Sequence, residues 1–293
     1  MTRNGSLSSQ DAFDYIVVGG GSAGCLLANR LSRDPAMRVL LLEAGRKDDY
    51  PWIHIPVGYL YCIGNPRTDW LYKTEPDAGL NGRSLRYPRG KTLGGCSSIN
   101  GMIYMRGQAR DFDGWATATG DEGWSWQNCL PDFKAHEDHY RLDNGADPAT
   151  GGNSRFSDMH GHGGEWRIEK QRLKWDILES FAEAAVEAGI PRSDDFNSGD
   201  NEGVGYFEVN QRSGWRWNTS KAFLRPAKNR QVATGDRASK FTHGRFVMSS
   251  GDWGAPCAAS SFGLAHTTVR IVPILVAIMV LSGNRPIRAA IST

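Results

Sequence analysis

Apolar and polar positions near the start of the chain follow the order of a strand, a helix and a second strand. Residues 13–18 form a short apolar run with β-branched side chains, which is typical of a buried parallel strand. Residues 23–31 are rich in alanine and leucine and predict a helix, and residues 38–42 predict the second strand. The pattern therefore predicts a strand–helix–strand unit over residues 12–45 of an α/β fold.

A first glycine motif lies where the first strand meets the helix. Gly19, Gly21 and Gly24 have the G-x-G-x-x-G spacing, and Glu43 ends the second strand 19 residues after Gly24. In such a motif the glycines allow a tight turn, close approach of a pyrophosphate and close helix packing, while the acid binds ribose hydroxyls. The helix N-terminus would attract the phosphates. The motif predicts a dinucleotide site; the alternatives are a glycine-rich turn without a ligand and a solvated acid at a strand end.

A second glycine motif occupies residues 88–100. Gly94 and Gly95 are followed by the small polar residues Ser97, Ser98 and Asn100. Such a loop can lie against a flat ring and offer amide donors to its polar edge, as a flavin requires. The residues alone leave open a phosphate-binding loop or a plain turn.

The two motifs and several later segments resemble the glucose–methanol–choline (GMC) oxidoreductase family, and most closely its choline dehydrogenase-like and alcohol dehydrogenase-like members. The resemblance covers roughly residues 11–230. It is carried by residues 14–24, 41–45, 69–70, 74–76, 90–107 and 218–224. It implies a Rossmann-like FAD-binding domain with part of a substrate-side α+β domain, C-terminally incomplete, in a flavoprotein that oxidises an alcohol by hydride transfer to flavin N5.

The resemblance also assigns cofactor contacts. The expected cofactor-binding residues are Gly19, Gly21, Ser22, Gly24, Glu43, Ala44, Leu93, Gly94, Asn100, Gly101, Met102 and Ile103. The glycines and Ser22 of the first motif would hold the pyrophosphate, Glu43 the adenosine ribose, and the residues from Leu93 onward the flavin. Some relatives attach the flavin through a histidine where this chain has Ile99, so the resemblance implies non-covalent FAD.

The chain divides by composition and resemblance into three parts. Residues 1–11 are a polar N-terminal tail, residues 12–230 are the GMC-type FAD-binding region with substrate-side segments within about 130–215, and residues 231–293 are an atypical tail. That tail has two acids, Asp236 and Asp252, against six lysines or arginines. The family's catalytic histidine and its His or Asn partner belong to a C-terminal region with no counterpart here. No catalytic residue is therefore assigned, and we expect a truncated chain that is weakly active or inactive.

Charge and cysteine usage limit the classes of binding partner and the cellular compartment that we expect for this protein. The 293 residues carry a net charge of +2 with dispersed basic residues, which excludes a strong nucleic-acid footprint. Five scattered cysteines without a C-x-x-C pair predict reduced thiols in a cytoplasmic protein. No secretory signal is visible, and the longest apolar stretch, residues 271–281, is shorter than the roughly 20 residues that cross a bilayer. The expected partner is a small-molecule alcohol, and no oligomeric state is predicted.

Several histidines stand close together without the spacing of a metal site. His160 and His162 flank Gly161 but have no further ligands at suitable spacing, so no metal is predicted. His136 and His139 are expected on a solvated helix face. Residues 176–188 have the period of an amphipathic helix.

Three functions fit these observations. The first is an FAD-dependent oxidoreductase acting on CH–OH groups. The second is an FAD-binding fragment that acts as an interaction or regulatory partner of a longer relative. The third is a non-functional gene relic, for which exposed sheet edges would be expected.

Overall fold

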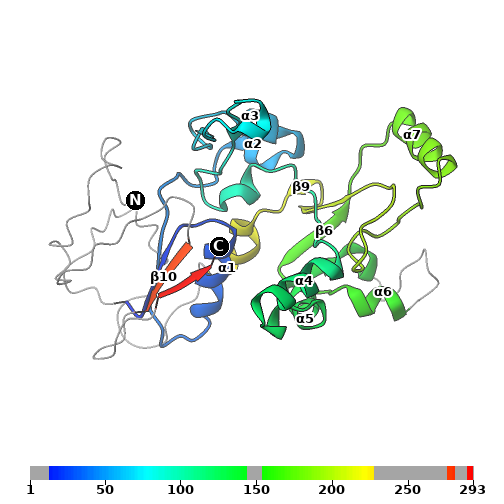
Figure 1. Ribbon diagram of the computed structural model, residues 1–293. Helices are drawn as coiled ribbons and strands as arrows, with labels where there is room; N and C mark the ends of the chain where they lie inside the picture. Colours follow the sequence, from blue (N-terminus) through cyan, green and yellow to red (C-terminus); the bar gives the residue numbers. More distant parts are fainter. Residues whose placement is uncertain (1–12, 144–153, 228–275, 281–288, 293) are drawn as a thin grey trace. The chain divides into compact units, whose positions relative to one another are not determined.

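The computed structural model describes residues 13–143, 154–227, 276–280 and 289–292, which fall into two compact units (Figure 1). Unit 1 comprises Met1–Tyr50, Leu60–Ile99 and Thr219–Thr293, and unit 2 comprises Pro51–Tyr59 and Asn100–Asn218. Unit 2 includes the predicted substrate-side segments, but its long segment begins at Asn100, well before residue 130, and it also contains Pro51–Tyr59. The expected tail at residues 1–11 and most of the tail at 231–293 lie outside the described residues.

Unit 1 is built on the predicted strand–helix–strand unit. Strand β1 (Tyr15–Val18) pairs in parallel with β2 (Val39–Leu42), and α1 (Ser22–Leu31) connects them. On its other edge β1 pairs antiparallel with β10 (Val276–Val280), which in turn pairs with β11 (Ala289–Ser292). The sheet order is β11-β10-β1-β2, so the sheet is mixed (Figure 1). The second edge of β1 is therefore covered by a segment of the atypical tail.

The helix of this unit packs on a late segment of the chain. Val17, Cys25 and Ala28 are fully buried where α1 covers the sheet. Asn29, also buried, donates from Nδ2 to the carbonyl of Phe223 at 2.7 Å. The remaining elements of the unit are α3 (Tyr59–Cys62), β3 (Tyr72–Lys73), η2 (Ala78–Leu80), β4 (Arg86–Tyr87), η3 (Gly95–Ser98), the π-helical turn η6 (Ser220–Leu224) and α8 (Arg225–Ala227).

Unit 2 surrounds a second small sheet. Strand β6 (Trp166–Lys170) pairs in parallel with β5 (Glu137–His139) and antiparallel with β7 (Glu208–Val209). Strands β8 (Gln211–Arg212) and β9 (Trp215–Arg216) form a short hairpin. The helices are α2 (Pro51–His54), η1 (Pro56–Gly58), α4 (Ala109–Thr119), η4 (Glu122–Trp124), α5 (Trp126–His136), η5 (Tyr140–Leu142), α6 (Ser154–Met159) and α7 (Asp176–Glu187).

The amphipathic helix predicted over residues 176–188 is confirmed as α7, but its large apolar side chains are not buried. Ile177 and Phe181 are 69% and 67% exposed, whereas the small residues Ala182 and Ala185 are buried. In Figure 1 α7 stands clear of β6, α4 and α5. The periodicity therefore predicted the helix correctly without showing which residues the fold covers.

A network of buried charges crosses unit 2. The Arg106 guanidinium lies 2.6 Å from Glu137 Oε2, and neither side chain is exposed. The other oxygen of Glu137 lies 3.1 Å from His160 Nδ1, and His160 Nε2 lies 3.1 Å from Asp195 Oδ2. Because both ring nitrogens face carboxylates, which only accept, the His160 ring is held as an imidazolium.

The expectation that His139 lies on a solvated helix face is wrong. Helix α5 ends at His136, and the chain continues as β5, where His139 is fully buried. Its Nδ1 accepts from the Arg141 backbone N–H, which leaves Nε2 to donate to Glu208 at 2.9 Å. The buried carboxylate that makes this position suitable for a histidine is 69 residues away in sequence.

None of the helices in the described parts of the chain has the length and hydropathy that a bilayer crossing requires. Of the apolar stretch at residues 271–281, residues 276–280 are described, and they form β10.

The buried ion pair predicts a large loss of stability when one partner is removed. Arg106→Met leaves the Glu137 carboxylate buried without its guanidinium partner. We expect the free energy of unfolding to fall by about 3–5 kcal/mol. Arg110→Met is the matched control, because Arg110 pairs with Glu202 on the surface and such pairs contribute about 0–1 kcal/mol. Urea unfolding measures both variants, and equal losses would contradict the assigned role of Arg106.

The same network predicts a dependence of stability on pH. Burial lowers the pKa of His160, but its hydrogen bonds to Asp195 and Glu137 outweigh burial and raise the pKa above its usual value. The stabilisation is thus fully present below the unfolded pKa of about 6.5 and is lost as pH rises through the folded pKa. At the acid end, burial raises the pKa of Glu137 and of Asp195, but their bonds to His160 hold both below the usual value, so their contribution is lost as pH falls.

We expect the free energy of unfolding to decline above neutral pH in the natural chain. The decline should be absent in His160→Gln and retained in His136→Gln, whose ring Nδ1 lies 2.7 Å from the Asp132 carbonyl of its own helix. Urea titrations at a series of pH values measure this, and an identical decline in all three proteins would exclude His160 as its source.

Candidate cofactor site

The turn from β1 to α1 has a backbone that only glycines allow. Gly19 has a φ of +98°, and its N–H donates to the Leu42 carbonyl at 2.8 Å, which ties the turn to β2. A Cβ on Gly24 would lie 1.9 Å from the Gly19 carbonyl oxygen. The first and third glycines of the motif are therefore required by the fold itself.

The N-terminus of α1 is open at the middle glycine. Gly21 is the N-cap residue, no side chain caps it, and the first turn carries no acid. A Cβ at Gly21 would meet nothing within 4 Å, and Ser22 beside it is exposed. Helix N-terminal amides and the helix dipole favour an anion at such a position. The turn therefore fits the pyrophosphate of a dinucleotide.

The two glycine motifs contact one another directly. The Gly94 N–H donates to the Gly20 carbonyl at 2.7 Å, and a Cβ on Gly95 would lie 2.7 Å from Gly21 Cα. The Leu93 N–H, just before, donates to the Arg46 carbonyl at 2.9 Å. The structure thus brings the predicted phosphate turn and the predicted flavin loop together as bare backbone against bare backbone.

Glu43 has a second role that the sequence did not reveal. Its Oε2 accepts from the Gly20 N–H at 2.7 Å, and its Oε1 accepts from the Gly45 N–H at 2.6 Å. Burial raises the pKa of this carboxyl, although the two amides partly counteract it. Each oxygen retains further acceptor capacity, so the carboxylate can hold the turn and still accept from ribose hydroxyls. Ala44 next to it is exposed.

The second motif continues from unit 1 into unit 2. Ile99 is buried after η3, and the chain enters unit 2 at Asn100. Asn100, Gly101 and Ile103 are exposed, whereas Met102 is buried with a φ of +64°. The other predicted cofactor residues, from Gly19 to Gly94, all lie in unit 1.

The side chains of Ser97 and Cys25 hold the backbone of the glycine loops in place. Ser97 donates to the Gly94 carbonyl at 2.6 Å, and its hydroxyl accepts from the Thr219 N–H at 3.0 Å. Cys25 donates from its thiol to the Gly20 carbonyl at 3.2 Å, and burial raises its pKa to about 12. Cys25 is therefore a packing residue rather than a nucleophile. The resemblance at residues 218–224 was the available hint for Thr219.

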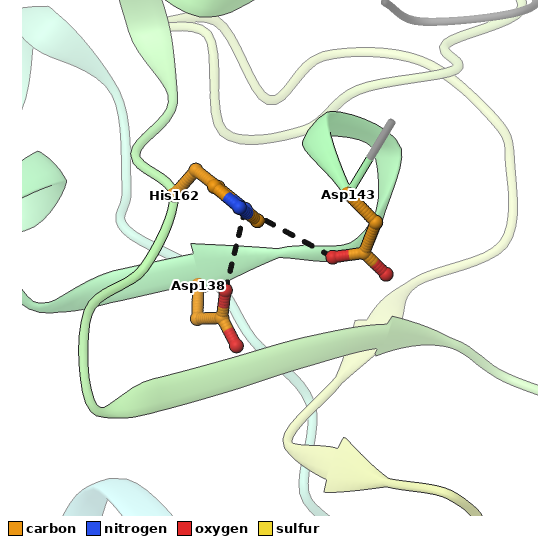
Figure 2. A group of neighbouring side chains, drawn as sticks. All are labelled: Asp138, Asp143 and His162. Carbon is orange, nitrogen blue, oxygen red and sulfur yellow. Dashed lines mark ion pairs between the residues drawn. The ribbon is translucent and has the colours of Figure 1, made fainter. Parts of the chain in front are cut away.

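Three side chains in unit 2 lie close enough together to hold a metal ion, but the two carboxylates among them are paired with arginines. Figure 2 shows His162 beside Asp138 and Asp143, with ligand atoms all within 4.8 Å of one another. Arg167 lies 2.6 Å from Asp143 and 3.3 Å from Asp138, and Arg212 lies 2.8 Å from Asp138. The Arg167 hydrogen bonds lower the pKa of Asp143. Because the guanidinium groups account for this cluster, we assign no metal to it.

The histidine pair of the sequence, His160 and His162, is divided between two environments. His160 is buried in the ion network, and His162 is half exposed near Asp138. The absence of a metal ion stays a prediction.

Comparison with known proteins identifies relatives along most of the chain. The family model described as GMC oxidoreductase matches residues 13–250, which extends past the predicted limit at residue 230. The chain is 44% identical over 212 residues to the alcohol dehydrogenase [acceptor] of Pseudomonas putida, covering 72% of this chain and 36% of the relative. It is 41% identical over 231 residues to the oxygen-dependent choline dehydrogenase of Staphylococcus haemolyticus, covering 78% and 38%.

Solved structures share the same fold. Pyridoxine 4-oxidase from Mesorbium loti superposes with a TM-score of 0.68 at 38% identity, over 75% of this chain and 41% of that one. A formate oxidase from Aspergillus oryzae, studied for modification of its FAD, has a TM-score of 0.62 at 28% identity, over 71% and 36%. The chain thus spans about two fifths of the length of the relatives it matches. The expected resemblance, fold class and cofactor are confirmed, and the chain belongs to the GMC oxidoreductase family of FAD-binding flavoproteins.

Proposed function

We propose that this chain binds FAD without a covalent bond and forms the cofactor-binding part of an oxidoreductase acting on the CH–OH group of a small-molecule alcohol. The observation that carries the proposal is the contact between the glycine turn at Gly20 and the glycine loop at Gly94, beside the uncapped start of α1. Bare backbone at both motifs leaves amides and open space where a dinucleotide would otherwise meet side chains.

Each side chain or amide has a proposed task. The first-turn amides of α1, from Ser22 onward, would hold the pyrophosphate, and Glu43 would accept from the adenosine ribose beside Ala44. Leu93 and Gly94, and the residues from Asn100 to Ile103, are assigned to the flavin. Bound FAD would supply the acceptor of the hydride from the alcohol.

The alcohol as substrate class is supported by the relatives. The Pseudomonas putida relative is named as an alcohol dehydrogenase, and the Staphylococcus relatives as choline dehydrogenases. No general base is assigned among the described residues of this chain. We therefore expect this chain alone to bind FAD without efficient alcohol turnover. Oxidation of the alcohol is proposed only for a protein that also has the family's C-terminal region.

The proposed location is the cytoplasm. Cys25, Cys62, Cys96 and Cys129 are free thiols, as a reducing compartment maintains them.

A substitution in the glycine turn tests cofactor binding. Gly24→Ala would place a Cβ 1.9 Å from the Gly19 carbonyl and force the turn open, so we expect FAD affinity to fall about tenfold or more. Gly114→Ala is the matched control, because that glycine is exposed on α4 and an added Cβ would meet nothing within 4 Å. Flavin fluorescence titration measures both, and equal affinities would contradict the assigned phosphate turn.

The mode of attachment is tested by acid precipitation of the FAD-loaded chain. We expect all of the flavin in the supernatant, because Ile99 offers no nucleophile where some relatives have a histidine. Cys96→Ser removes the exposed thiol of the same loop and should release flavin equally. Absorbance at the flavin maximum measures how much flavin is in the supernatant and how much is in the pellet. Flavin that remains in the pellet would contradict non-covalent binding.

A further inference from the structure

Arg216 is the largest fully buried side chain among the described residues of the chain. It lies on β9, the second strand of a hairpin whose turn residues Ser213 and Gly214 have φ values of +53° and +82°. Two successive positive φ angles are the mark of a tight hairpin turn that holds its strands in one register. Across the hairpin Arg216 pairs with Gln211. Its backbone is therefore fixed by local structure.

The guanidinium of Arg216 clamps Asn100 at two points. One terminal nitrogen donates to Asn100 Oδ1 at 2.9 Å, and the other donates to the Asn100 carbonyl at 2.7 Å. The Met102 N–H also donates to Asn100 Oδ1, at 3.1 Å. With two donors on Oδ1, the orientation of the amide is settled, and its NH₂ group points away from the clamp.

The segment after Asn100 is held from the same hairpin region. The Asn210 N–H donates to the Met102 carbonyl, and the Trp217 N–H donates to the Asn210 carbonyl, both at 2.9 Å. Met102 has a φ of +64°, a conformation that is costly for a bulky residue and persists only where its surroundings impose it. The clamp and the hairpin together therefore preset the backbone that carries Asn100.

Asn100 itself is exposed, and within the described residues its NH₂ group donates to no acceptor. We propose that Arg216 is a positioning residue, which fixes Asn100 so that its amide NH₂ donates to the polar edge of the flavin. This inference rests on the proposed function, which assigns Asn100 to the cofactor. The buried positive charge behind the amide polarises it and strengthens the outward donor.

Asn100→Asp is the sharpest test, because it retains both oxygen acceptors for Arg216 and Met102 but removes the outward donor. We expect the thermal stability to be kept and FAD binding to weaken about tenfold, the effect of losing one well-formed hydrogen bond. The flavin absorption maximum should shift as well, which a purely structural residue would not cause. Unchanged affinity and spectrum would overturn the proposal.

Arg216→Lys tests the clamp, because lysine keeps the charge but loses the planar fork. We expect weaker FAD binding, and in the double variant with Asn100→Asp a loss smaller than the product of the single losses, since both act through one amide. Arg212→Lys is the matched control on the facing strand, where the side chain is half exposed and pairs with Asp138. Fully multiplicative losses, or wild-type affinity in Arg216→Lys, would overturn the positioning role.

The natural chain serves as the reference in every titration. If it binds no FAD, the proposed function fails and this inference fails with it. If it binds FAD and Asn100→Asp binds equally well, the inference alone fails.

Discussion

The close approach of two bare backbones is the constraint on which unit 1 depends. The Gly94 N–H reaches the Gly20 carbonyl only because neither neighbouring glycine carries a Cβ, as the 2.7 Å distance from a Cβ on Gly95 to Gly21 Cα shows. Glu43 then fixes the same turn from the end of β2 through the amides of Gly20 and Gly45. The groups that would bind the cofactor are thus the groups that hold the turn together. We therefore expect cofactor affinity and local stability to be coupled in this unit.

Unit 2 depends on a different constraint, because it buries several charged side chains together. Arg106, Glu137, His160 and Asp195 form a continuous chain of ion pairs in which each carboxylate faces a cation. Removing a single member would strand a buried charge, so such a network is retained or lost as a whole. The exposed apolar side chains of α7 belong to the same unit. Unit 2 thus buries paired charges in its interior, while several large apolar side chains of α7 are exposed.

Glycine spacing and apolar periodicity predicted the strand–helix–strand unit well, because the constraint there is local. The turn at Gly19, the helix α1 and the strand β2 follow from short-range rules, and the structure confirms each of them. His139 shows where local rules fail: its position after a helix suggested a solvated face, but its partner Glu208 is distant in sequence. Helix α7 was predicted correctly, but its large apolar side chains are exposed, because periodicity specifies a helix face and not what covers it.

The sequence by itself determined the strand–helix–strand unit, the two glycine motifs and the family, because these depend on residue types at fixed short spacings. Only the tertiary structure decided that the two motifs touch, that Glu43 holds the turn, and that Arg216 clamps Asn100 across 116 residues of chain. The physical reason is that a hydrogen bond or an ion pair depends on distance in space. No short-range pattern encodes which residues the folded chain brings within reach of one another.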